Sequence, residues 1–386
     1  MIILYVIALI PIIVGSILFY LNKNIIWWEW LAGAGIAILT AMIFNYFAYR
    51  GLVGDQETWS GQITNVRQFS QWLEFYKEAI YKTEYYTTTE SYYDSSSKST
   101  RTRTVRKSRR VFSHWEDRTR NHPEYWVAYS NIETNYNINK PDYLFLVEKF
   151  GGAKSIQGVR HTSEHDSKMI GGDPNDYIAA KPRDGYIHPV TKSVFFENRL
   201  KATRNIFKFE SVNEKQAQQL KLFNYPAAAG FGATKRYMTI VPEAPKAALA
   251  RRLDDLNAIL GPTYHINIII INWGSNDISI ASKQLGYWGP SKKNDFIIQY
   301  GKNWATVFSW SESELCKRNV ESIFIEDQDL EKLGKEVTAR YKLVNWHKFD
   351  YLNIEPTSNQ LILYIFIVVL LQGGIFIYFH HNEFQK

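Results

Sequence analysis

The sequence has a single cysteine, Cys316, among its 386 residues. One cysteine excludes an intramolecular disulfide and any zinc ribbon built from cysteines. It leaves the redox compartment open. The surrounding sequence, SESELCKRN, shows no general base for the thiol, so we expect Cys316 to be a small residue that packs a helix.

Ionisable side chains are missing from three long stretches, at residues 2–20, 31–49 and 361–379. Each stretch is 19 residues long. At about 1.5 Å per residue, a helix of that length nearly matches the roughly 30 Å hydrocarbon core of a bilayer. The sequence therefore predicts three transmembrane helices and excludes a freely soluble protein.

The first two apolar stretches predict a transmembrane helical hairpin over residues 1–49. The first lacks a basic start and the second follows after only ten residues, which favours a retained span over a cleavable signal peptide. Trp27, Trp28 and Trp30 suit the headgroup layer. Small residues at 32–35 let another helix approach closely, either the first helix or one from a second copy, so an oligomer remains open.

The charged residues are concentrated between the apolar stretches, where residues 50–358 carry the net charge of +7. Of the lysines and arginines, only Lys23 and Lys386 lie outside that segment. Lysines in short loops beside membrane spans are retained in the cytoplasm. This predicts an integral, multi-pass protein with its large domain outside the cytoplasm and a third transmembrane helix within residues 358–386.

The first part of the central segment, residues 50–212, is expected to be a β-rich module. Aromatic and β-branched residues crowd the stretches at 57–66, 82–93 and 122–130, and such residues favour pleated, half-buried positions. The polar run DSSSKS at 94–99 has the composition of a hairpin tip.

Seven basic residues surround or follow this tip, and no acidic residue lies among them in the sequence. Arg101, Arg103 and Val105 alternate with threonines, so in a strand they share one face. The run can be a solvated edge strand, where positive charge prevents edge-to-edge pairing. It can also bind anionic lipid or, as the least favoured alternative, nucleic acid. Besides Lys98, the candidate residues for binding an anionic surface are Arg101, Arg103, Arg106, Lys107, Arg109 and Arg110.

The second part of the central segment, residues 213–357, has the pattern of an α/β module. The expected elements are a strand at 236–243, a helix at 245–262, a strand at 264–273, a helix at 278–288, strands at 295–301 and 305–310, and a helix at 327–343. This order predicts a sheet sandwiched by helices. The expected fold class is an α+β membrane protein with three transmembrane helices, a β-rich module and an α/β/α module.

Residues 244–344 resemble the TPM domain, named after its occurrence in thylakoid and membrane proteins. The resemblance rests on the amphipathic helix, the isoleucine-rich strand and a following strand that ends at Gly301, together with Ala281, Trp288, Gly289, Lys292, Lys293 and Asn294. It implies an α/β/α sandwich and membrane association. Some TPM proteins have been described as phosphatases or as maintenance factors for membrane complexes.

Most of the chain also resembles a poorly characterised family of membrane-anchored proteins found in bacteria and phages. The segments that carry this resemblance are ETWSGQITNV at 57–66, HPEYWVAYSN at 122–131, FFENRL at 195–200, WGPSKKNDFII at 288–298 and FDYLNIEPT at 349–357. Members of this family often carry cysteines in the hairpin region. Here Ser, Thr and Arg take their place, so we expect no metal or disulfide role for the hairpin.

Other candidate chemistry is weaker. Asp277 and Asp295 can converge at neighbouring loop ends and bind a divalent cation, or they can be ordinary cap and turn residues, which we favour. HTSEH at 161–165 matches an inverted zinc-protease pattern but lies among glycines and polar residues rather than on a long helix, so we expect no metal. GFGATK at 230–235 lacks the ending of a phosphate loop and is expected to be a turn.

These observations predict a membrane-anchored scaffold or binding protein. Its expected partners are the lipid bilayer, anionic lipid or a membrane protein complex, and we expect no cofactor. The alternative is a metal-dependent phosphatase-like enzyme of the TPM type. Clustering of Asp277 with Asp295 in the fold would distinguish the two hypotheses.

Overall fold

The computed structural model describes residues 2–21, 27–94, 99–156, 168–170, 177–183, 185–203, 209–242, 246–289 and 291–383. The chain forms two compact units. The first unit combines Met1–Gln62 with His188–Lys386, and the second is Ile63–Ile187. Strand β1, Gly54–Phe69, contributes residues to both.

The apolar stretches of the first unit are helices: α1 (Ile2–Leu21), α2 (Trp27–Val53) and α10 (Ser358–Glu383). Leu4 and Ala8 of α1, Ala41 of α2, and Tyr364 and Val368 of α10 form a common core. Among the small residues at 32–35, Gly33 contacts α10 within the chain, where its carbonyl accepts a hydrogen bond of 3.1 Å from Gln372.

Two of these helices are long and apolar enough to cross a bilayer over their described residues, Trp30–Val53 and Ser358–Ile375. The corresponding part of α1, Ile2–Ile17, is shorter. Large apolar side chains on all three helices, such as Ile10, Phe47 and Phe366, are exposed rather than packed inside the protein. An exposed apolar surface of this kind is expected on helices that face lipid.

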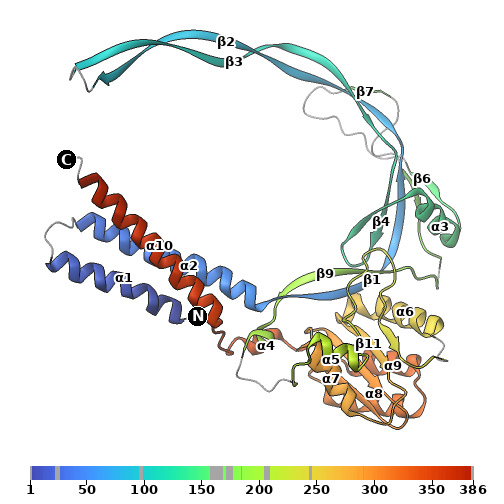
Figure 1. Ribbon diagram of the computed structural model, residues 1–386. Coiled ribbons are helices and arrows are strands. Elements are labelled where there is room, and N and C mark those ends of the chain that lie inside the picture. The colour runs from blue at the N-terminus through green and yellow to red at the C-terminus, as the bar shows by residue number, and fades with distance from the viewer. Residues whose placement is uncertain are drawn as a thin grey trace. The chain divides into compact units, whose positions relative to one another are not determined.

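The remainder of the first unit is a mixed α/β layer structure (Figure 1). Its four strands are β10 (Tyr237–Thr239), β11 (Asn267–Asn272), β12 (Asp295–Tyr300) and β13 (Ala305–Ser309). They are arranged in the order β10-β11-β12-β13, with β13 antiparallel to the other three. The isoleucine run of β11 is buried throughout, as expected for a parallel strand covered on both faces.

Helices cover both faces of this sheet. On one face, α6 (Lys246–Tyr264), α8 (Glu314–Glu326) and α9 (Leu330–Arg340) pack on Ile268, Ile270 and Phe296. On the other face, α7 (Ser279–Trp288) packs on Ile269, Ile271 and Ile297. The expected helices at 245–262, 278–288 and 327–343 are therefore present, and α8 is an additional helix that the expected order did not contain.

Several shorter elements complete the first unit. Strand β9, Pro189–Glu197, pairs antiparallel with residues 54–62 of β1. The short helices are α4 (Arg199–Ala202), α5 (Glu214–Gln219) and the 3₁₀ helix η1 (Trp346–Phe349).

The second unit is β-rich, as its composition predicts. One sheet has the order β5-β4-β1-β8-β6 and is accompanied by helix α3, Lys140–Phe150. Its strands besides β1 are β4 (Tyr125–Ser130), β5 (Asn135–Ile138), β6 (Lys154–Ile156) and β8 (Tyr177–Ala180). The buried residues include Val66, Ala128 and Leu146.

The predicted hairpin is confirmed as the longest element of the second unit. Strand β2, Trp72–Asp94, pairs antiparallel with β3, Ser99–His122, from Trp72 opposite His122 to Asp94 opposite Ser99. A single irregularity lies between Ile80 and Tyr81. The short strand β7, Lys168–Ile170, adds to β2 at residues 73–75. Figure 1 shows β2 and β3 as a long two-stranded ribbon.

Candidate functional site

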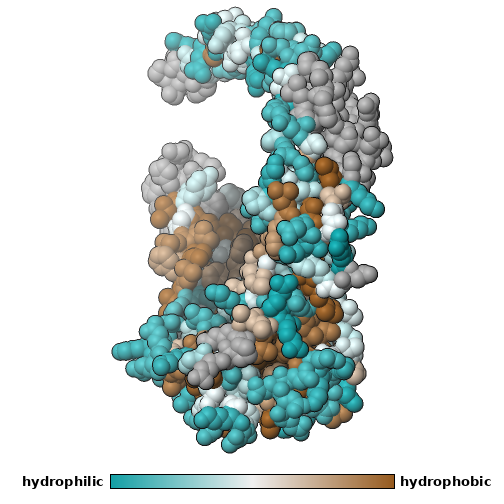
Figure 2. Space-filling model, turned by 90° about the vertical axis from the view of Figure 1, so that its right-hand side faces the viewer, coloured by the Kyte–Doolittle hydropathy of each residue, from teal (hydrophilic) through white to brown (hydrophobic). Residues whose placement is uncertain are grey.

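The candidate basic residues lie on both faces of the hairpin. Register partners share a face, and residues two apart along a strand share a face. Arg101, Arg103, Lys107 and Arg109 are therefore on one face, opposite Tyr92, Glu90, Tyr86 and Glu84. Arg106 and Arg110 are on the other face, opposite Thr87 and Thr83. The hairpin surface is predominantly hydrophilic in Figure 2.

The structure places carboxylates beside these cations, although no acidic residue lies among them in the sequence. Glu90 lies 2.7 Å from Lys107 and 3.5 Å from Arg103, and Glu84 lies 3.3 Å from Arg109 and 3.1 Å from Lys82. The acids come from β2, across the hairpin, so they are distant in sequence and adjacent in space. Lys82 and then Arg109 lower the pKa of Glu84, and Lys107 and then Arg103 lower that of Glu90.

The cations nevertheless outnumber the acids on this face. Over residues 82–92 of β2 and 101–111 of β3, two glutamates, Glu84 and Glu90, share this face with five cations: Lys82, Arg101, Arg103, Lys107 and Arg109. All of these ion pairs are solvent-exposed, with about two thirds of the Arg109 side chain accessible. Exposed pairs of this kind are weak. The face therefore retains a positive surplus that can attract an anionic partner.

The opposite face combines arginine with exposed aromatic rings and has no carboxylate beside Arg106 or Arg110. The Arg106 guanidinium lies 4.4 Å from the centre of the Tyr85 ring, and that of Arg110 lies 5.3 Å from the Tyr81 ring. Phe112 contacts both Tyr81 and Trp115 through ring-to-ring packing. Exposed aromatic rings beside cations are the composition found at lipid headgroups.

Asp277 and Asp295 do not converge, so the structure gives no support to the cation site that the sequence offered as the less favoured alternative. Asp295 begins β12 opposite Asn267, at the amino end of two parallel strands. Asp277 follows the carboxyl end of β11, so the two carboxylates belong to opposite ends of the sheet. Asp277 instead accepts hydrogen bonds from the backbone N–H and hydroxyl of Ser279, at 2.8 and 2.9 Å. Within the described part of the chain, no group of three or more His, Cys, Asp or Glu side chains is placed to hold a metal ion.

Asp295 has a packing role. It is fully buried and accepts hydrogen bonds from the Tyr225 hydroxyl (2.7 Å), the Asn267 amide (2.9 Å) and the backbone N–H of Lys292 (2.8 Å). Burial raises its pKa to about 6. The ammonium group of Lys292 pairs with Asp55, beside a cavity of about 470 Å³ that Ser193 and Phe195 also line. The charges of Lys292 and Asp55 neutralise one another, so neither side chain presents an unpaired acid or base to the cavity.

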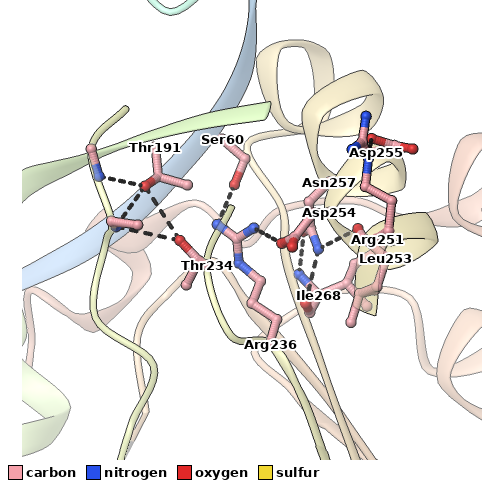
Figure 3. Close-up of polar contacts among 12 residues, drawn as sticks. Ser60, Thr191, Thr234, Arg236, Arg251, Leu253, Asp254, Asp255, Asn257 and Ile268 are labelled. Atoms are coloured by element: carbon pink, nitrogen blue, oxygen red, sulfur yellow. Dashed lines mark hydrogen bonds and ion pairs between the residues drawn. The ribbon is translucent and has the colours of Figure 1, made fainter. Parts of the chain in front are cut away.

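A second buried pair joins Arg236 to Asp254 of α6 (Figure 3). The guanidinium lies 3.2 Å from the carboxylate and donates a hydrogen bond of 2.7 Å to the Ser60 hydroxyl. Burial raises the pKa of Asp254 to about 6 and lowers that of Arg236. Beside the pair, Asn257 accepts from the backbone N–H of Ile268 at 2.7 Å and donates to its carbonyl at 3.0 Å. The cluster joins helix and strand to β1.

Sequence reasoning missed Arg236, because an arginine at the start of an apolar strand gives no local signal of burial.

The glycine-rich segment 230–235 behaves as a turn: Gly230 and Gly232 have positive φ angles. The N–H groups of Ala229 and Gly230 donate to the Thr191 hydroxyl at 2.9 and 3.1 Å, so they are engaged within the protein (Figure 3).

Cys316 is buried in α8, as expected for a packing residue, and burial raises the pKa of its thiol to about 11. The HTSEH segment at 161–165 lies outside the described residues.

The fold defines a mixed α/β protein with two helices that can cross a membrane and an exposed basic β-hairpin. Comparison with protein-family models, with curated proteins and with solved structures finds no match for this chain.

Proposed function

We propose that this chain is a membrane-anchored binding or scaffold protein whose basic hairpin docks on an anionic surface, with lipid headgroups as the favoured surface. The observation that carries the proposal is the long ribbon of β2 and β3, exposed on both faces, with a surplus of arginine and lysine. A structural role alone would not require eight cations on one exposed strand.

The arrangement of charges supports an electrostatic role. Each basic residue near an anionic membrane contributes about 1 kcal/mol to binding, and the attraction decays within a Debye length. Glu84 and Glu90 partly neutralise one face and leave Arg106 and Arg110 on the other. Cation–π contacts with Tyr85 and Tyr81 hold those two guanidinium groups beside the strand without neutralising them.

The anchoring part of the proposal has three transmembrane helices, α1, α2 and α10, with the large domain outside the cytoplasm. It is supported by the three uncharged stretches, by the large apolar side chains exposed on the surface of these helices, and by the lysines at positions 23 and 386. The α/β module with helices on both faces of its sheet has the layer order implied by the TPM resemblance. A metal-dependent phosphatase gains no support, because Asp277 and Asp295 occupy opposite ends of that sheet.

The test uses the full chain held in phosphatidylcholine nanodiscs and measures its co-flotation with vesicles that contain phosphatidylserine. Replacing Arg101, Arg103, Arg106 and Arg109 with Gln should weaken binding at least tenfold at about 0.1 M salt, and the difference should shrink near 1 M as the Debye length falls to about 3 Å. Replacing Glu84 and Glu90 with Gln should have the opposite effect and strengthen binding.

A matched control removes the same charge elsewhere. Arg251, Arg318, Lys332 and Lys335 are exposed cations of α6, α8 and α9, and their replacement with Gln should leave vesicle binding within about twofold of the wild type. Equal losses in the two four-residue variants would show that only net charge matters. Unchanged binding in both would mean that the hairpin cations are merely solvated, and either result would overturn the proposal.

A further inference from the structure

The two strands of the hairpin leave long edges without a neighbouring strand. The sheet order is β3-β2-β7, and β7 covers β2 only at residues 73–75. Within the described chain, no strand pairs with the outer edge of β2 over residues 76–94 or with that of β3 over residues 102–119. A two-stranded ribbon is marginally stable alone, and an open edge is a template for pairing with another chain.

The two edges carry opposite charge. Strand β2 has five carboxylates and two lysines, whereas β3 has eight arginines and lysines and two carboxylates. Two β3 edges brought together would place cation beside cation, and directly opposed like charges are destabilising. A β3 edge beside a β2 edge instead continues the pairing that already occurs inside the hairpin, where Arg103 is opposite Glu90 and Arg109 is opposite Glu84.

We infer that hairpins of neighbouring copies of this chain pair edge to edge, with β3 of one copy beside β2 of the next. Hairpins that point in the same direction form such a contact with antiparallel strands, the same relation that β2 has to β3. The contact is head-to-tail, so it builds a closed ring or an open array rather than an isolated dimer.

Membrane anchoring makes the assembly geometrically simple, and this step rests on the proposed function. Copies inserted with the same orientation in one bilayer differ by a shift in the membrane plane and a rotation about the membrane normal, so a small rotation between neighbours keeps their hairpins nearly parallel. Each added hairpin gives its neighbour a third and a fourth strand. The aromatic cluster of Tyr81, Phe112 and Trp115 would then recur along one face of the shared sheet.

Disulfide cross-linking between two differently tagged copies tests this pairing. Both copies carry Cys316→Ala, which removes the only native cysteine. One copy carries Thr88→Cys in β2, and the other carries one cysteine on the matching face of β3. That cysteine is scanned in steps of two residues over positions 101, 103, 105, 107, 109 and 111, because a slip of one residue would turn it to the other face. Each chain has a single cysteine, so no cross-link can form within a hairpin.

In phosphatidylcholine bilayers, the expected result is a cross-link between the two tags with a maximum at one β3 position. Val105→Cys alone and Thr88→Cys alone should give no cross-linked product. A product from Val105→Cys alone would indicate β3–β3 contact, and one from Thr88→Cys alone would indicate β2–β2 contact. Either product, or no cross-link at any β3 position, would overturn the inference. The absence of anionic lipid separates this outcome from that of the vesicle-binding test.

Discussion

The α/β layers of the first unit and the hairpin of the second both contain ion pairs between an arginine and a carboxylate, but these pairs have different roles. Arg236 and Asp254 lie 3.2 Å apart with at most 5% of either side chain exposed, whereas Arg109 and Glu84 lie 3.3 Å apart in solvent. In the buried pair both groups are desolvated, so each charge depends on the other for stabilisation. In the exposed pair both groups remain hydrated and can exchange partners. Burial, rather than residue type, therefore separates structural charges from charges available for binding.

Helix α6 contains a matched pair of sites that can break this comparison. Asp254→Ala leaves the buried Arg236 guanidinium without its anion and should lower the free energy of unfolding by about 3–5 kcal/mol. Asp255→Ala removes an exposed partner of Arg251, also at 3.2 Å, and should cost less than about 1 kcal/mol. Urea denaturation of the full chain in detergent, followed by tryptophan fluorescence, measures both. Similar losses at the two neighbouring positions would refute the role assigned to burial.

The pH dependence of stability provides a smaller effect from the same buried region. Burial raises the pKa of Asp295 from 3.8 to about 6, so between these values the folded protein binds more protons than the unfolded chain. Its contribution to stability is therefore present below about pH 4 and lost as the pH rises to about 6, by up to about 3 kcal/mol.

Asp295→Asn isolates this contribution because it removes the titrating group. As the pH rises from 4 to 6, the wild type should lose unfolding free energy relative to Asp295→Asn. Above that range the difference between the two proteins should become constant. A difference that is constant with pH, or that moves toward the wild type, would show that the folded-state pKa is not raised.

Local patterns were sufficient to predict several elements of both units. The leucine spacing of residues 245–262 predicted α6, the isoleucine run predicted β11, and the polar DSSSKS segment predicted the hairpin in which β2 pairs with β3. These features depend on side-chain periodicity and turn composition, which neighbouring residues determine.

The features that the sequence did not reveal are contacts between residues that are distant in sequence. Glu84 and Glu90 became partners of β3 cations only through the register of the hairpin. Asp277 and Asp295 separated because β11 and β12 are parallel, which places the end of one strand far from the start of the next. Arg236 was missed because its burial depends on Ser60 and Asp254, 176 and 18 residues away. Register, strand direction and long-range burial are properties of the fold that no local pattern contains.

Hydrogen–deuterium exchange tests the central claim most directly, because it reports on both units of the same protein in one experiment. Adding phosphatidylserine vesicles to the full chain in phosphatidylcholine nanodiscs should slow exchange severalfold in peptides covering residues 102–112 of β3. Peptides covering β11 and β12 should be unchanged, and vesicles of phosphatidylcholine alone should protect neither region. No protection of β3, or equal protection of β11 and β12, would contradict the claim that the exposed basic hairpin is the binding surface of this protein.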